Sequence, residues 1–168
     1  STGAITLNNI TNGIISNFWN WGTLNFNAGT SAVNVTGSSA MTQNNFNTTW
    51  NLTGIANITG NISSLTGATN TLNINDTANS TISGVLSGAT ILRKSGANLL
   101  TVSGTNTYTA ATNINAGTLQ IGSAGSLGSG SYAGAIVVAS GASFRYSSSA
   151  AQTLSGIISG AGAVTKDI

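Results

Sequence analysis

The chain has no cysteine, histidine, proline or glutamate among its 168 residues. Its only carboxylates are Asp76 and Asp167, which lie far apart in the sequence. General acid–base catalysis needs a pair of titratable groups, and a serine or threonine nucleophile needs a base beside it. The composition therefore predicts that the chain is not an enzyme and that it holds no cofactor.

The same scarcity argues against several partners. Zinc sites are built from cysteine and histidine, and calcium sites need several oxygen ligands, of which carboxylates supply the charge. The four cations, Arg93, Lys94, Arg145 and Lys166, give a net charge of +2 and are too scattered for a phosphate-binding stripe. No apolar run approaches the roughly 20 residues of a membrane-spanning helix. We therefore expect no metal site, no nucleic-acid partner and no membrane insertion.

The residues that are present are typical of an all-β protein. The chain is 40% hydrophobic, which argues against disorder, and its polar residues are mainly Asn, Thr, Ser and Gly. Without proline, every backbone N–H stays available for a ladder of hydrogen bonds between strands.

Apolar residues recur in short alternating triplets, which is the pattern of half-buried strands. Turn-forming clusters such as Asn115-Ala-Gly separate them, and no helical periodicity persists, so we expect essentially no α-helix. The triplets are Ile5-Thr-Leu7, Leu24-Asn-Phe26, Val33-Asn-Val35, Trp50-Asn-Leu52, Leu72-Asn-Ile74, Leu100-Thr-Val102, Leu119-Gln-Ile121, Ile136-Val-Val138 and Phe144-Arg-Tyr146.

Several triplets follow one another at about 17 to 22 residues, a spacing typical of solenoid coils. We expect one domain, residues 1–168, of about eight coils, in which residues 1–80 are Asn- and Trp-rich and residues 81–168 hold all the cations. A β-sandwich of short antiparallel strands is the alternative that spacing alone does not exclude. The pairs at this spacing are Ile5 with Leu24, Trp50 with Leu72, Leu100 with Leu119, and Leu119 with Ile136.

Residues 83–122 resemble the passenger-associated repeat of bacterial autotransporters. The segment from Lys94 to Leu119 follows its pattern, with departures at Asn98, Ala110 and Ala111, where glycine is common. The matching residues are Lys94, Gly96, Leu100, Thr101, Ser103, Gly104, Asn106, Thr107, Tyr108, Thr109, Thr112, Ile114, Gly117, Thr118 and Leu119.

A second, truncated copy of the repeat covers residues 154–168. It belongs to an internal similarity at an offset of 72, in which Thr81-Ile-Ser-Gly aligns with Thr153-Leu-Ser-Gly and Lys94 with Lys166. The resemblance implies a right-handed parallel β-helix that is secreted or exposed on the surface of a bacterium, after removal of a signal peptide. Functions in such a family include adhesion and aggregation, and the repeat itself is associated with passenger export.

The two ends of the sequence suggest head-to-tail stacking. The repeat stops after Lys166, and the first residues of the chain would resume it in the next subunit. An unclosed head-to-tail interface generates filaments. The expected joint consists of Ala4, Ile5, Leu7, Ala163, Val164 and Ile168.

We therefore expect a structural subunit of an extracellular bacterial fibre or matrix, whose partner is another copy of itself. The alternative is an adhesin fragment of an autotransporter passenger that binds cells or glycans through its lateral surface. Trp19, Trp21 and Trp50 could stack on a sugar, although such aromatics are more often core or interface anchors. The many asparagines could form ladders from coil to coil, or serve as ordinary turn residues.

Overall fold

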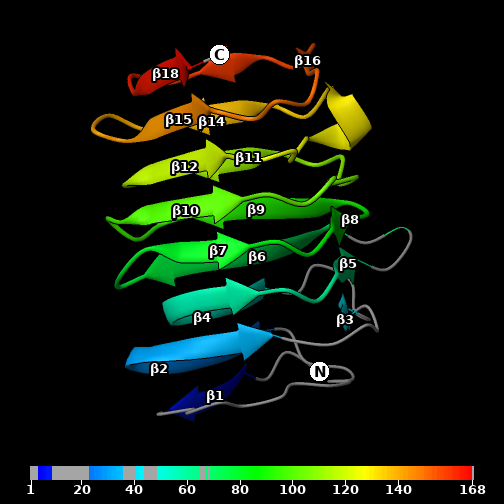
Figure 1. Cartoon of the computed structure of the whole chain (residues 1–168). Helices are drawn as coiled ribbons and strands as arrows, with labels where there is room; N and C mark the ends of the chain where they lie inside the picture. The colour runs from blue at the N-terminus through cyan, green and yellow to red at the C-terminus, as the bar shows by residue number, and fades with distance from the viewer. Residues whose placement is uncertain are drawn as a thin grey trace.

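A computed structural model of the chain describes the following residues, with side chains from residue 49 onwards: 4–8, 23–35, 41–43, 49–64, 67 and 69–167. In these ranges the backbone forms a stack of short strands, with β1 at one end and β18 at the other (Figure 1). Every strand pairing is parallel. The predicted parallel β-solenoid is confirmed, and the antiparallel sandwich was the wrong alternative.

Two rows of strands make up most of the wall. The first face runs through β6 (Asn70–Asp76), β9 (Thr90–Lys94), β11 (Thr112–Ile114), β14 (Ile136–Val138) and β17 (Ile158–Ser159). The second face runs through β7 (Ser80–Ile82), β10 (Leu99–Val102), β12 (Thr118–Ile121), β15 (Ser143–Tyr146) and β18 (Ala163–Lys166).

The two faces meet at β4 (Thr49–Ile58). Its first part pairs with β6 and its end pairs with β7, so one long strand contributes to both rows. Below it follow β2 (Thr23–Val35) and β1 (Ala4–Asn8). The third side is made of shorter pieces: β3 (Met41–Gln43), β5 (Ile62–Ser64) and β8 (Leu86–Ser87) in one sheet, and β13 (Ser131–Tyr132) and β16 (Thr153–Leu154) in another.

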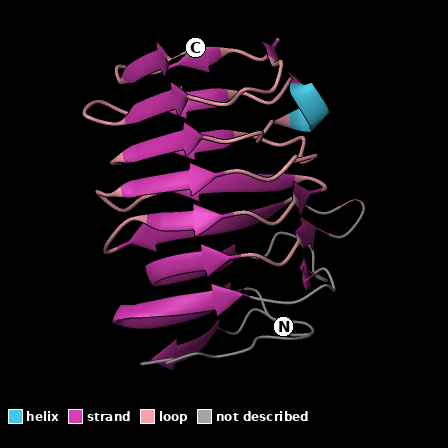
Figure 2. Cartoon of the chain, in the orientation of Figure 1, coloured by secondary structure: helices cyan, strands magenta, loops and turns pink. Residues whose placement is uncertain are grey.

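The described part of the chain has fewer turns than expected and almost no helix. About five turns, from β6 and β7 to β17 and β18, have separate strands on both faces, against the eight coils expected, while β4, β2 and β1 are stacked below as single strands. Among the described residues the only helical element is the 3₁₀ turn Gly128–Gly130, drawn in cyan in Figure 2. The expected lack of α-helix therefore holds for this part of the chain.

The strands bury every second side chain in the lumen. In β4 and β6 the inward residues are buried while the residues between them remain partly accessible. This alternation follows from the strand period of two and places one continuous apolar core inside the coil. Trp50 belongs to that core with only 5% of its surface exposed.

Three of the four predicted pairs are register partners: Ile5 with Leu24, Trp50 with Leu72, and Leu100 with Leu119. The fourth is wrong. Leu119 pairs with Phe144 on the second face, whereas Ile136 pairs with Thr112 on the first. Each turn carries two buried triplets, so spacing alone does not say which face the next triplet joins.

The two copies of the 72-residue similarity also lie on different faces. Leu86 belongs to the third side, but its counterpart Ile158 belongs to the first face. Lys94 is on the first face and Lys166 on the second. Each segment of the second copy therefore lies one face further along the coil than its counterpart in the first copy.

Candidate functional surfaces

The described residues contain no group of three or more potential metal-ligating side chains of the His, Cys, Asp and Glu type. Their two carboxylates lie in opposite environments. Asp76 is buried in the lumen, whereas Asp167 is exposed and pairs with Arg145. Hydrogen bonds from Ser147 and Arg145 hold the pKa of Asp167 below its usual range.

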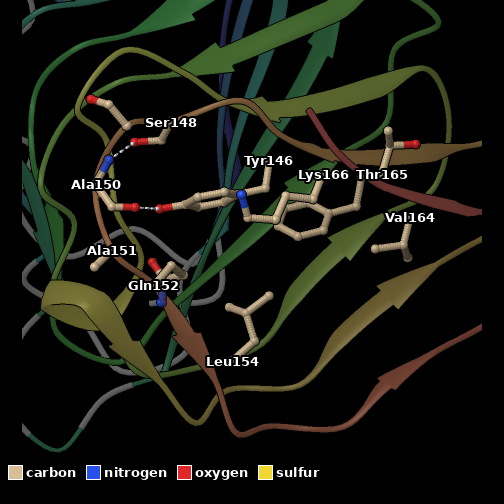
Figure 3. Close-up of a pocket in the computed structure, with 11 residues that line it drawn as sticks. Tyr146, Ser148, Ala150, Ala151, Gln152, Leu154, Val164, Thr165 and Lys166 are labelled. Carbon is tan, nitrogen blue, oxygen red and sulfur yellow. Dashed lines mark hydrogen bonds between the residues drawn. The ribbon is translucent and has the colours of Figure 1, made fainter. Parts of the chain in front are cut away.

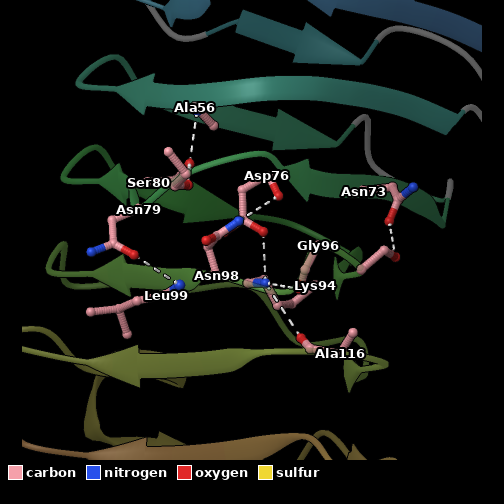
Figure 4. A network of polar contacts seen from close by, with 12 residues as sticks. Ala56, Asn73, Asp76, Asn79, Ser80, Lys94, Gly96, Asn98, Leu99 and Ala116 are labelled. Carbon is pink, nitrogen blue, oxygen red and sulfur yellow. Dashed lines mark hydrogen bonds and ion pairs between the residues drawn. The ribbon is translucent and has the colours of Figure 1, made fainter. Parts of the chain in front are cut away.

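Lys94 and Asp76 form an ion pair inside the apolar core (Figure 4). The Lys94 Nζ lies 2.8 Å from Asp76 Oδ1, and neither side chain is exposed. The ammonium also donates to the backbone carbonyls of Gly96 and Ala116. Asp76 Oδ2 has no hydrogen-bond partner among the described residues, so Lys94 is the group that compensates this carboxylate.

Gly96 makes room for this pair. A Cβ added at residue 96 would lie 1.9 Å from Asp76 Oδ1 and 2.3 Å from the Asp76 carbonyl oxygen. Any larger residue would therefore push the carboxylate off its position. In this chain the glycine two residues after Lys94 therefore leaves room for Asp76 of the preceding coil.

The outer side of the first face carries rows of neutral polar residues near its start. In register, Thr49 is followed by Thr71 and Asn51 by Asn73. The Asn73 side-chain amide donates to Asn51 Oδ1 at 2.9 Å, and Ser95 Oγ donates to Asn73 Oδ1 at 2.6 Å. The expected asparagine ladder is thus present at this position. We call the outward residues of two strands the polar rows: Thr49, Asn51 and Thr53 of β4, and Thr71, Asn73 and Asn75 of β6.

Other asparagines lie between strands and accept hydrogen bonds from the backbone of a neighbouring coil. Asn61 Oδ1 accepts the N–H of Val85, and Asn79 Oδ1 accepts that of Leu99. Asn106 is fully buried, and its Oδ1 accepts the N–H of Leu86. The side chains of these three asparagines therefore also join one coil to the next, and no asparagine in the described ranges has a left-handed backbone.

A hydrogen-bonded chain of tyrosines and threonine crosses the lumen near the third side. Tyr132 donates to the carbonyl of Ala110, so Thr112 donates to Tyr132 at 2.9 Å and Tyr108 to Thr112 at 2.6 Å. The two tyrosine rings meet edge to face, with centroids 5.3 Å apart. Burial raises the pKa of both phenols, that of Tyr108 well above its ordinary value.

The last described coil leaves the lumen open. Val164 stacks on Phe144 but is 53% exposed, and Ile158 is 40% exposed. A cavity of about 440 Å³ lies beside Val164, and Phe144, Tyr146 and Lys166 are among the residues that line it (Figure 3). The Tyr146 hydroxyl donates to the Ala150 carbonyl at 2.7 Å and closes one side of this cavity.

The residues proposed for the subunit joint are only partly described. Ala163 and Val164 lie on β18 in the exposed last coil, and Ile168 lies outside the described residues. Ala4, Ile5 and Leu7 lie on β1, where only the backbone is described. Five of the six residues therefore lie on the first and the last of the described strands.

The expected sugar platform is not available at Trp50. Its ring lies in the core, so it cannot present a face to a glycan, and for this residue the glycan-stacking prediction was wrong. Trp19 and Trp21 lie outside the described residues.

The described part of the chain contains no helix with the length and hydropathy needed to span a membrane. A family model described as passenger-associated-transport-repeat matches residues 92–121. No curated protein and no solved structure matches the chain. The matched segment begins in β9 and ends with β12, so it covers about one and a half turns of the solenoid. Such a repeat suggests a secreted or cell-surface protein. Residues 92–121 therefore match a passenger-associated transport repeat and lie within a parallel β-solenoid, which is consistent with an autotransporter passenger repeat.

Proposed function

We propose that the chain is a non-enzymatic segment of an autotransporter passenger, presented outside a bacterial cell, that binds cell-surface glycans through its lateral wall. The match of residues 92–121 to the passenger-associated repeat carries the passenger part of this proposal. The polar rows support the binding part. They offer amide and hydroxyl groups at regular spacing on a neutral strand surface, and such groups match the hydrogen-bonding groups of a sugar.

Binding of labelled protein to a glycan array and to whole cells tests this function. We expect selective, saturable binding by the natural chain. The variant Thr71→Lys/Asn73→Lys places two cations on the polar rows and should lose that binding. The variant Thr81→Lys/Thr101→Lys places the same charges on the outer side of the second face and serves as the matched control.

Equal glycan binding by the two variants would show that the polar rows are not the contact surface. Absence of selective binding by the natural chain would overturn the adhesive role.

A second candidate is assembly into a head-to-tail filament. It is favoured by the way successive coils pair: among the described residues each coil stacks on the next in parallel register, so a coil of another copy could continue the stack by the same hydrogen bonds. Stacking of this kind buries apolar surface between the coils.

Negative-stain electron microscopy of the purified chain tests filament formation. Uniform filaments are expected, and Ile5→Lys or Val164→Lys should abolish them while leaving the monomer folded. Val137→Lys is the control, because Val137 is exposed on the outer side of the first face. Single short rods at high protein concentration would rule out the filament, without bearing on glycan binding.

A further inference from the structure

Two of the six charged residues of the chain are completely buried, and they contact each other. The other four are at least partly accessible to solvent. A buried ion pair contributes little net stability compared with well-packed apolar residues, because both ions lose their hydration. The Asp76–Lys94 pair therefore calls for a role other than holding the coils together.

The pair is built so that neither charge can be left alone. The three ammonium protons of Lys94 have three acceptors on three successive coils: Asp76 on one side, Gly96 on its own coil and Ala116 on the other. Asp76 also anchors the next coil through its backbone, since Asn98 Nδ2 donates to its carbonyl at 3.1 Å. Displacement of β6 along β9 would leave an ammonium and a carboxylate buried without each other.

The apolar side chains around the ion pair do not by themselves fix the observed register of β6 on β9. The inward residues of β6 and β9 include Leu72, Ile74 and Leu92, which are aliphatic side chains of similar size. A slip by one residue would turn them outward, but a slip by two keeps every apolar side chain in the lumen. Hydrophobic burial therefore distinguishes poorly between the observed register and one shifted by two residues.

We propose that the Asp76–Lys94 pair is a register lock, and that Asp76 is the positioning residue that selects which part of the chain closes over the buried lysine of the repeat. In the observed register Ile74 lies opposite Lys94 and Asp76 lies opposite Gly96, where space is available for its carboxylate. A shift by two residues in either direction removes the carboxylate from that space. The register of β6 on β9 is thereby determined by the opposite charges of Asp76 and Lys94, in addition to the pattern of apolar residues.

Cysteine cross-linking measures the register directly, because the natural chain has no cysteine. Register partners on neighbouring strands are about 4.8 Å apart, within reach of a disulfide, whereas diagonal positions are roughly 8 Å apart and beyond it. Asn73→Cys/Arg93→Cys reports the observed register. Thr71→Cys/Arg93→Cys and Asn73→Cys/Ile91→Cys report the two shifted registers.

Each cysteine pair is introduced into the chain that keeps Asp76 and Lys94 and into the variant Asp76→Leu/Lys94→Met. The disulfides that form are identified by mass spectrometry. With the ion pair present, only the observed-register disulfide should form. With the apolar pair the protein should remain folded by circular dichroism, and the shifted disulfides should rise several-fold above background.

If that variant does not fold, Asp76→Ala/Lys94→Ile replaces it with smaller side chains. Exclusive formation of the observed-register disulfide in a folded apolar variant would overturn the register lock. The cross-linking result is independent of glycan binding and of filament formation.

Discussion

Lys166 is the register partner of Tyr146 on the second face, as Lys94 is the register partner of Ile74 on the first. Two residues beyond Ile74 lies Asp76, but two residues beyond Tyr146 lies Ser148. Lys94 is fully buried against its acid, whereas Lys166 is exposed and lines the cavity of the last described coil. The two equivalent lysines of the internal similarity therefore differ in what they contribute to stability.

The first prediction compares these lysines. Lys94→Met leaves the Asp76 carboxylate buried without a counter-charge and should lower the free energy of unfolding by about 3–5 kcal/mol. Lys166→Met removes an exposed charge and should change it by less than about 0.5 kcal/mol. Urea unfolding followed by circular dichroism measures both, and equal effects of the two substitutions would contradict the buried pair.

The second prediction concerns Gly96. Gly96→Ala puts a methyl group in the space of the Asp76 carboxylate, and such overpacking should cost about 1–3 kcal/mol of unfolding free energy. Gly122→Ala is the control, because a Cβ there would meet only the movable side chains of Thr101 and Gln120, the nearest atom 3.1 Å away. A shift in the urea midpoint for Gly96→Ala no larger than for Gly122→Ala would contradict the close approach of residue 96 to Asp76.

The third prediction uses the buried tyrosines. Because burial raises the pKa of Tyr108 and Tyr132 in the folded state, the folded protein holds these protons at pH values where the unfolded chain, with an ordinary pKa of about 10, releases them. The contribution of these protonated phenols to the free energy of unfolding is therefore fully present below a pH of about 10. It is lost progressively as the pH rises above that value. Ultraviolet titration should show delayed phenolate formation that accompanies unfolding.

Tyr108→Phe is the matched variant for that titration, and it should flatten the alkaline loss of stability. An unchanged alkaline profile in Tyr108→Phe would mean that this phenol does not control the transition.

The fourth prediction tests the asparagine ladder. Asn73→Ala removes the hydrogen bonds to Asn51 and Ser95 and should lower the unfolding free energy by about 1 kcal/mol. Asn113→Ala on the same face, opposite Arg93, should have a smaller effect. Thermal unfolding of the two variants distinguishes a contributing ladder from an incidental contact, for which both substitutions would be equal.

Much of the architecture could be predicted because the strands are simple. The alternation in Leu72-Asn-Ile74 and Leu100-Thr-Val102 marks which side chains enter the lumen. In the structure the first and last residue of each triplet are buried. What spacing did not predict was the assignment of Leu119 and Ile136 to different faces, since two buried segments in each turn produce overlapping intervals.

The buried ion pair was missed because charged residues are expected at the surface. The signal was nevertheless present in the strand period. Asp76 follows Ile74 by two residues, and Lys94 follows Leu92 by two, so both continue an inward-facing series. The contact between them could not be predicted, because it depends on the register of two strands from different coils.

The parallel stacking also has a mechanical consequence. The hydrogen bonds between successive coils run along the axis of the stack, so tension along that axis would open one coil at a time instead of shearing many strands together. Lys94 contacts groups on the coils before and after its own. Under such a load, separation of β6 from β9 would require pulling apart two opposite charges in an apolar interior, so this level of the stack should resist axial tension more than its neighbours.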